Sequence, residues 1–165
     1  MIRIINLFFI IFFLLSSKAY SLIEIDITRG NLDPLPIAVS PLFQDDNSKR
    51  NSINELKIEN VGSEISLVVE NNLKISGLFN PLSKEAFLQK PDIAHLKPRF
   101  EDWALIKAQA LITGKVTIED KKLKVEFRLW DILAGREMMA LAFTTVPSNW
   151  RRVGHIISDK VYERL

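Results

Sequence analysis

Residues 110–131 read ALITGKVTIEDKKLKVEFRLWD, and this stretch decides the fold. In its second half, apolar residues occupy every other position: Leu123, Val125, Phe127 and Leu129. The positions between them hold Lys124, Glu126, Arg128 and Trp130. Alternation with a period of two is typical of a strand that buries one face. The pattern predicts a strand over 110–118, a polar turn at 119–122 and a second strand over 123–131.

The residues after this hairpin extend it into a meander. Gly135 predicts a turn within 131–136, and residues 137–145 predict a third strand. We expect Ser148 to cap a closing helix. The buried stripe of that helix is expected to contain Trp150, Val153, Ile157, Val161 and Leu165.

Upstream of the hairpin, the spacing predicts one long helix that begins at Asn60 and closes at Gly77. Its apolar stripe is Val61, Ile65, Val68, Val69 and Leu73. Residues 37–39 predict a short buried strand, and 100–107 a short helix with Trp103 on its apolar face. Residues 44–54 and 82–98 lack a clear period and are expected to be loops, and Asn80-Pro81 a turn.

This order of elements predicts a single α/β domain. We expect a mixed sheet of about five strands, with the meander as its antiparallel part, packed against two or three helices. Hydrophobic residues make up 47% of the sequence, which is ample for a core in one domain of this length.

The first 21 residues are typical of a cleaved secretory signal peptide. Arg3 supplies a positive start, residues 7–15 are apolar, and Ala19-Tyr20-Ser21 predicts cleavage between Ser21 and Leu22. A membrane anchor is the alternative interpretation, but a spanning helix needs about 20 apolar residues. We therefore expect export to the periplasm and no integral membrane segment in the mature chain.

Charge argues against nucleic acid as a partner. The chain has 22 Lys and Arg against 20 Asp and Glu. Two of the bases, Arg3 and Lys18, lie in the leader, which holds no acid, so 20 of each sign remain. A chain without excess positive charge is poorly suited to neutralise phosphates.

Few residues in the sequence point to catalysis or to a cofactor. There are no cysteines and only two histidines. His95 has no second ligand at a useful spacing. His155 precedes Ser158 and Asp159, but within a helix only Asp159 could reach its ring, so a surface hydrogen bond is the simpler interpretation than a catalytic triad. The tryptophans are expected to be packing residues, and we expect no enzyme, no metal and no cofactor.

Several segments resemble the N-terminal domain of the TolB family, the periplasmic component of the Tol–Pal system. They are 36–39 (PIAV), 73–81 (LKISGLFNP), 103–116 (WALIKAQALITGKV), 125–131 (VEFRLWD) and the closing 150–165 (WRRVGHIISDKVYERL). Together they extend over essentially the whole mature chain, and the closing helix is the most specific part.

The resemblance implies a non-enzymatic adaptor that links inner-membrane Tol proteins with the lipoprotein Pal. It implies roles in outer-membrane invagination during cell division and in outer-membrane integrity. It also implies that the extreme N-terminus of the mature chain contacts TolA. In this sequence that segment is Leu22, Ile23, Glu24, Ile25, Asp26, Ile27, Thr28 and Arg29.

The alternation of isoleucine with polar residues in 22–29 suits pairing with the sheet of a partner. An ordinary edge strand of the domain's own sheet is the other interpretation. The expected organisation is a signal peptide at 1–21, a partner-binding strand or tail at 22–35 and a TolB N-terminal-like domain at 36–165. In the family a β-propeller follows this domain and makes the Pal contacts, and we expect this chain to be a fragment or a separately encoded domain. A stand-alone periplasmic small-ligand-binding domain is the alternative function.

We predict that the exported protein begins at Leu22, because the small residues Ala19 and Ser21 flank the cleavage site. Intact-mass spectrometry of the periplasmic fraction should give the mass of residues 22–165. Retention of Met1, or recovery of the protein with the inner membrane, would contradict the prediction.

Overall fold

A computed structural model describes residues 33–165. The expected signal peptide (1–21), its cleavage site between Ser21 and Leu22, and the expected partner-binding segment Leu22–Arg29 lie outside the described residues. The described part, Asp33–Leu165, is one compact unit built on a single sheet.

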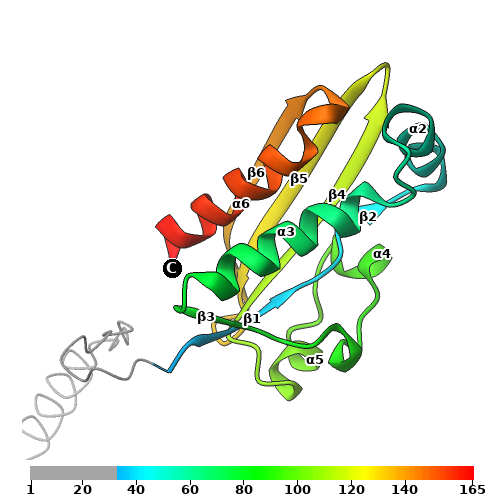
Figure 1. Cartoon of the computed structure of the whole chain (residues 1–165). Coiled ribbons are helices and arrows are strands. Elements are labelled where there is room, and N and C mark those ends of the chain that lie inside the picture. Colours follow the sequence, from blue (N-terminus) through cyan, green and yellow to red (C-terminus); the bar gives the residue numbers. More distant parts are fainter. Residues whose placement is uncertain (1–32) are drawn as a thin grey trace, which may run out of the picture. The chain divides into compact units, whose positions relative to one another are not determined.

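A mixed sheet of six strands organises this unit (Figure 1). The strands are β1 (Leu35–Val39), β2 (Phe43–Gln44), β3 (Phe79–Pro81), β4 (Ala110–Glu119), β5 (Lys122–Asp131) and β6 (Arg136–Thr145). Their order is β3-β1-β4-β5-β6, and β2 also pairs with β4. β1 is parallel to β3 and β4, and β2 is parallel to β4, whereas β5 is antiparallel to β4 and β6. The predicted α/β class, mixed sheet and antiparallel meander are confirmed.

The meander has the expected connections. Glu119 lies opposite Lys122, so Asp120 and Lys121 form a two-residue turn between β4 and β5. Both turn residues have positive φ, 48° and 57°, which is the backbone of the hairpin turn whose twist matches that of the flanking strands. The turn into β6 contains Gly135 with φ 62°, a conformation that glycine adopts without steric cost.

The first half of strand β4, residues 110–114, is buried on both faces of the sheet. Ile112 and Val116 belong to a core formed with α3 (Val61–Ile75) and α6 (Trp150–Arg164). Leu111 points the other way, because successive side chains of a strand alternate, and joins a second core with Trp103 and Trp130. Burial on both sides explains why residues 110–114 show no alternation, whereas the polar residues at 115, 117 and 119 alternate with the buried Val116 and Ile118.

The two long helices cover the face of the larger core. Figure 1 shows α3 and α6 crossing the same side of the sheet. The stripes predicted from sequence are confirmed, since the following side chains are all buried: Val61, Ile65, Val69 and Leu73 on α3, and Trp150, Val153, Ile157 and Val161 on α6. Val68 and Leu165 are partly buried against this core.

The second core lies beneath shorter helices. α5 (Phe100–Leu105) was expected, and its Trp103 is 1% exposed. Residues 82–98 were expected to be a loop, which is wrong in part, because they contain the short helix α4 (Pro91–Ala94) and a 3-10 turn, η1 (Lys84–Ala86). With these elements the described chain has more helices than the two or three expected.

The expected loop at 44–54 is wrong, because α2 (Asp46–Leu56) occupies most of it. Asp45 caps this helix by accepting a hydrogen bond from Ser48 N at 2.8 Å. Its buried face is made of serines: Ser48 Oγ accepts from Ile118 N at 3.2 Å, and Ser52 Oγ donates to Ile58 O at 2.7 Å. Hydrogen bonds rather than apolar contacts hold this face, so a search for apolar periodicity cannot find it.

Three smaller expectations also differ from the structure. Ser148 is not the N-cap of the closing helix, because η2 (Pro147–Asn149) precedes it and α6 begins at Trp150. Asn149 makes no capping bond and instead donates from Nδ2 to Thr145 Oγ1 at 3.0 Å. The expected turn at Asn80-Pro81 belongs to β3, and β2 was not expected; both strands are too short to show a period.

A buried hydrogen bond joins β4 and β5 on the side of the sheet that faces the second core. Trp130 Nε1 donates to Thr113 Oγ1 at 2.9 Å, and both residues are buried. Thr113→Val should lower the free energy of unfolding by about 1–3 kcal/mol, because the indole N–H loses its acceptor. Thr117→Val, on the same strand and at a half-buried position, is the matched control and should stay within about 0.5 kcal/mol. Urea unfolding would measure both, and equal effects would contradict the assignment.

The cap of α2 makes a prediction that depends on pH. The Ser48 backbone N–H bonded to the Asp45 carboxylate lowers the pKa of Asp45. Asp45→Ala should therefore lower the free energy of unfolding by about 1 kcal/mol at pH 7. Because the pKa is lowered on folding, the benefit is full above the unfolded pKa, at about pH 4, and is lost as pH falls through the folded pKa. Only a fraction of this stabilisation depends on pH, because the Asp45 side chain is 40% exposed and solvent screens its charge.

Thermal unfolding at pH 7 and at pH 3 would test this prediction. Asp46→Ala is the control, because Asp46 lies in the first turn but does not cap the helix. A difference in thermal midpoint between Asp45→Ala and wild type that is larger at pH 3 than at pH 7 would contradict the role of Asp45.

Candidate interaction sites

The site residues predicted from sequence, Leu22–Arg29, lie outside the described part of the chain. They precede β1, where Leu35 N donates to Leu78 O at 2.9 Å and fixes the start of the domain beside β3. The described residues show the scaffold that such a segment would join, together with other places where a partner or ligand could bind.

His155 lies in a polar cluster between α3 and α6. Asn72 Nδ2 lies 2.9 Å from His155 Nδ1 and donates to Ser158 Oγ at 3.0 Å. Ser158 Oγ in turn donates to Gly154 O at 2.9 Å. Because the Ser158 proton is used in that bond, its oxygen accepts from Asn72, and the same amide nitrogen faces an accepting His155 Nδ1.

This cluster corrects the expected role of Asp159 and joins two helices. The partner of His155 is Asn72 of the neighbouring helix, not Asp159 of its own. The helices approach closely at Gly154, where an added Cβ would lie 2.8 Å from Val68 Cγ1. Ser158 gives its proton to a main-chain carbonyl and not to a base, so the arrangement is an interhelical contact and not a catalytic triad. An open cavity of about 330 Å³ lies beside it, lined by His155, Asp159 and Tyr162 among others.

His95 and the tryptophans are packing residues. The His95 ring stacks on Phe43 with 4.5 Å between centroids, and its Nδ1 donates to Pro91 O at 3.0 Å. Trp103, Trp130 and Trp150 are all buried, as expected. Among residues 33–165, no group of three or more His, Asp or Glu side chains is placed to hold a metal ion.

The outer edge of β6 is a surface that the sequence analysis did not single out. Within Asp33–Leu165, β6 pairs with β5 alone and ends the sheet, as Figure 1 shows. Its central residues 140–142 are exposed and uncharged. An open cavity of about 350 Å³ is lined by residues of this strand and of α6, among them Phe143, Arg152 and Ile156. Backbone groups at an uncovered edge can pair with another strand.

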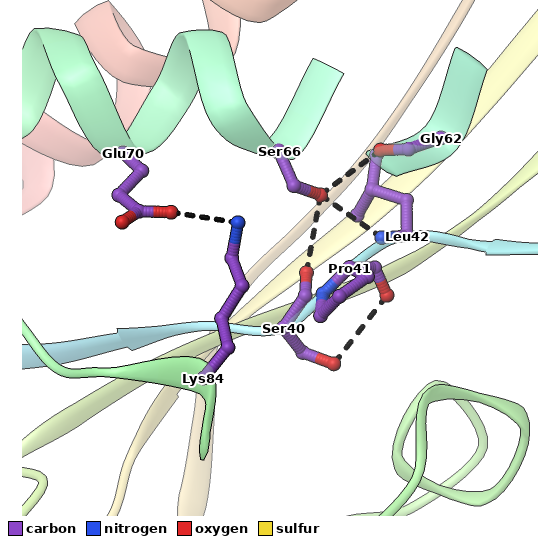
Figure 2. A network of polar contacts seen from close by, with 7 residues as sticks. All are labelled: Ser40, Pro41, Leu42, Gly62, Ser66, Glu70 and Lys84. Carbon is purple, nitrogen blue, oxygen red and sulfur yellow. Dashed lines mark hydrogen bonds and ion pairs between the residues drawn. The ribbon is translucent and has the colours of Figure 1, made fainter. Parts of the chain in front are cut away.

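The connection between β1 and β2 is tied to the start of α3. Figure 2 shows Ser66 of α3 between Ser40, Leu42 and Gly62. Ser66 Oγ accepts from Leu42 N at 2.9 Å, and it lies 3.2 Å from Ser40 O and 3.0 Å from Gly62 O, either of which can accept its proton. There is no room for a side chain at Gly62, since a Cβ there would lie 2.4 Å from Leu42 O.

A second polar contact lies farther along α3 in the same view. Lys84 Nζ is 2.8 Å from Glu70 Oε2, an ion pair that joins the helix to η1 (Figure 2). α3 is therefore bonded at two points along its length, at Ser66 to the segment after β1 and at Glu70 to η1.

None of the helices in the described region combines the length and the apolar character that crossing a membrane requires.

Comparisons with known proteins agree with these features. A family model described as the TolB amino-terminal domain matches residues 23–138. The chain is 74% identical over 157 residues to the Tol-Pal system protein TolB of Pelagibacter ubique (strain HTCC1062), an alignment that covers 95% of this chain. It covers only 35% of that relative, so the chain spans about a third of the relative's length.

A solved structure supports the same architecture. The crystal structure of TolB from Acinetobacter baumannii superposes with a TM-score of 0.62 at 20% identity, over 80% of this chain and 28% of that one. At this identity the likeness establishes the fold alone. The family model extends over more than half of the sequence and includes the long helix α3, strands β1 to β5 and the first residues of β6. This chain therefore belongs to the TolB amino-terminal domain family.

Proposed function

We propose that this protein acts in the Tol-Pal system as a non-enzymatic periplasmic adaptor. The observation that carries the proposal is the 74% identity over 157 residues to the Tol-Pal system protein TolB of Pelagibacter ubique. In this role the protein links inner-membrane Tol proteins with Pal, and so supports outer-membrane invagination during cell division and outer-membrane integrity.

The segment Leu22–Arg29 is the proposed contact with TolA. Its isoleucines, Ile23, Ile25 and Ile27, fall on one side of an extended chain, and the polar residues fall on the other. An extended segment of this kind can add to the sheet of a partner, where its backbone provides affinity and alternate side chains provide specificity. In the sequence, residues 30–34 separate it from β1.

Pal is a proposed partner of the system but has no assigned residue in this chain. In the family the Pal contacts belong mainly to the propeller, and the chain spans 35% of the length of its relative. The proposed cellular location is the periplasm, to which the signal peptide at 1–21 would direct export.

A stand-alone periplasmic domain that binds a small ligand is the second candidate function. One observation favours it, which is an open cavity of about 240 Å³ beside β2, lined by Phe43, Gln44 and Lys90 among others. The two functions are compatible, because the cavity and the segment 22–29 involve different residues.

Deleting residues 22–29 from the mature chain should abolish binding to the TolA C-terminal domain and leave the thermal midpoint unchanged. The reason is that the described core is built from residues between Ile37 and Val161, all of which the deletion keeps. Calorimetric titration and thermal unfolding of the same sample would measure both quantities. Retained binding would put the TolA site elsewhere. A collapsed midpoint would show that the segment is structural, since buried isoleucines contribute about 2–5 kcal/mol each.

A matched pair of point variants separates side-chain recognition from charge. Ile25→Ser should weaken TolA binding by more than about tenfold, since burying an isoleucine contributes about 1.5–3 kcal/mol. Glu24→Ser changes the opposite face of the same segment and should leave the affinity within about twofold. Equal losses in the two variants would contradict pairing through an apolar face.

A further inference from the structure

Strand β6 forms an edge of the sheet that carries no charge and no proline along most of its length. Within Asp33–Leu165 it pairs with β5 alone. Its two charged residues, Arg136 and Glu137, lie at the turn, and residues 138–145 read MMALAFTT. A register shift opposite Leu129 places a bulge at Met138, so the regular part of the edge begins at the next residue. Such an edge can pair with another chain, because lysine, proline or a covering element is what usually prevents it.

The register shows which backbone groups of β6 face outward. Glu119 and Lys122 close a two-residue hairpin as a hydrogen-bonded pair, and in antiparallel strands bonded and non-bonded pairs alternate. The odd-numbered residues of β5 therefore bond to β6, where they lie opposite Thr145, Phe143, Leu141 and Met139. The N–H and C=O groups of Ala140, Ala142 and Thr144 consequently point away from β5 and are available to a further strand.

Helix α6 runs back along β6 on one face of the sheet (Figure 1). Two contacts fix the alignment of strand and helix: Asn149 Nδ2 donates to Thr145 Oγ1 at 3.0 Å, and Arg164 Nε donates to Met138 O at 3.4 Å. Between these contacts the helix rises about 22 Å, and the strand extends about 23 Å. The two elements therefore stay side by side from one contact to the other.

The row of α6 that follows β6 is basic. Spacing by four residues places Arg152, Ile156, Lys160 and Arg164 on one row of the helix. Within the described residues the two arginines of this row make no ion pair, whereas Lys160 Nζ lies 2.7 Å from Glu163 Oε2. The row thus has an excess of positive charge beside an open strand edge.

The side chains of an added strand would meet this row in step. Residues four apart in a helix are about 6 Å apart along its axis, and alternate residues of a strand about 6.6–6.8 Å. Opposed residues of neighbouring strands share a face. Positions beside Met139, Leu141 and Phe143 would therefore face α6, since the β5 partners of these residues belong to the core beneath it. The cavity of about 350 Å³ lined by Phe143, Arg152 and Ile156 lies at one end of this run.

We propose that the outer edge of β6 binds an extended acidic segment of another protein, which adds to the sheet beside β6. On the side that faces α6, the segment carries an acidic residue beside Arg152, an apolar residue beside Ile156 and a second acidic residue toward Arg164. Charge favours this occupant over a second copy, because a copy paired through its own β6 would bring a second basic row against the first. The proposal does not depend on the role of residues 22–29.

The probe is a capped heptapeptide in which threonine alternates with glutamate, valine and glutamate. It is titrated into the mature chain at constant ionic strength while NMR follows the backbone amides. Saturable shifts of Ala140, Ala142 and Thr144 are expected. A peptide with N-methyl groups on its two inner threonines cannot donate to β6, and one with lysine in place of glutamate has the wrong charge. Each should bind at least about tenfold more weakly. Equal binding by either, or no saturable shift with the first peptide, would overturn the proposal.

A matched pair of arginine variants tests the basic row. Arg152→Gln should weaken binding of the glutamate peptide by about two- to fivefold. Arg151→Gln removes the same charge one position away, where the guanidinium lies 4.4 Å from the centre of the Trp150 ring, and should have no effect. The loss in Arg152→Gln should disappear when the peptide carries glutamine in place of glutamate, which a folding defect would not produce. Equal losses in the two variants would overturn the proposal.

Ala142→Pro tests the strand edge itself. It removes an outward N–H and no bond to β5, a change that edge strands accommodate. The thermal midpoint shows whether the variant is folded, and a folded variant should bind the glutamate peptide at least about tenfold more weakly. Undiminished binding by the folded variant would overturn the proposal.

Two other occupants of the edge give different results. A dimer of the mature chain in sedimentation that is lost in Ala142→Pro would assign the edge to a second copy. Shifts of the amides of residues 140–144 on deletion of residues 22–29, with no peptide present, would assign it to the chain's own N-terminal segment. Either result would overturn the proposal.

Discussion

Strand β4 pairs with three other strands, β1, β2 and β5, and its first half is buried on both faces between the two cores. Alternate side chains of residues 110–114 enter two separate cores, and the one polar side chain among them, Thr113, is bonded to Trp130. Its approach to β5 is also constrained. A Cβ on Gly114 would lie 2.1 Å from Glu126 O, so only glycine permits this pairing distance. The parallel and antiparallel halves of the sheet therefore meet at a strand that tolerates little change.

The positions of the interaction sites follow from that strand. Pairing with β4 holds the two residues of β2, and β2 brings Gln44 to the start of α3, where Gly62 N–H binds it. On the other side of β4, the meander ends in β6, whose outer edge is open within the described chain. A rigid centre with functional groups at its margins is the usual arrangement of binding proteins, because margins can vary without loss of the core.

Sequence patterns predicted the parts of this fold that apolar contacts hold. The meander and the stripes of α3 and α6 followed from periodicity and turn residues, whereas Trp130 falls in the polar set of its strand and is buried all the same. α2 was missed because Ser48 and Ser52 bury it through hydrogen bonds, and β2 and β3 because two or three residues show no period. The His155 contact was missed because Asn72 is 83 positions away. For the same reason, the cavity around Gln44 could not be predicted, since its walls come from segments that only the folded chain brings together. The partner-binding segment Leu22–Arg29 came from alternation and family resemblance and stays a prediction.

The central claim is that a stable α/β scaffold carries a separate recognition segment at its N-terminal end. Hydrogen–deuterium exchange of the mature chain, with and without the TolA C-terminal domain, tests it most directly. The account predicts that TolA slows exchange of the amides of residues 23–28 by at least about tenfold and leaves those of β4 and β5 unchanged. Slower exchange confined to residues of the sheet or of α3, with none in 23–28, would contradict it.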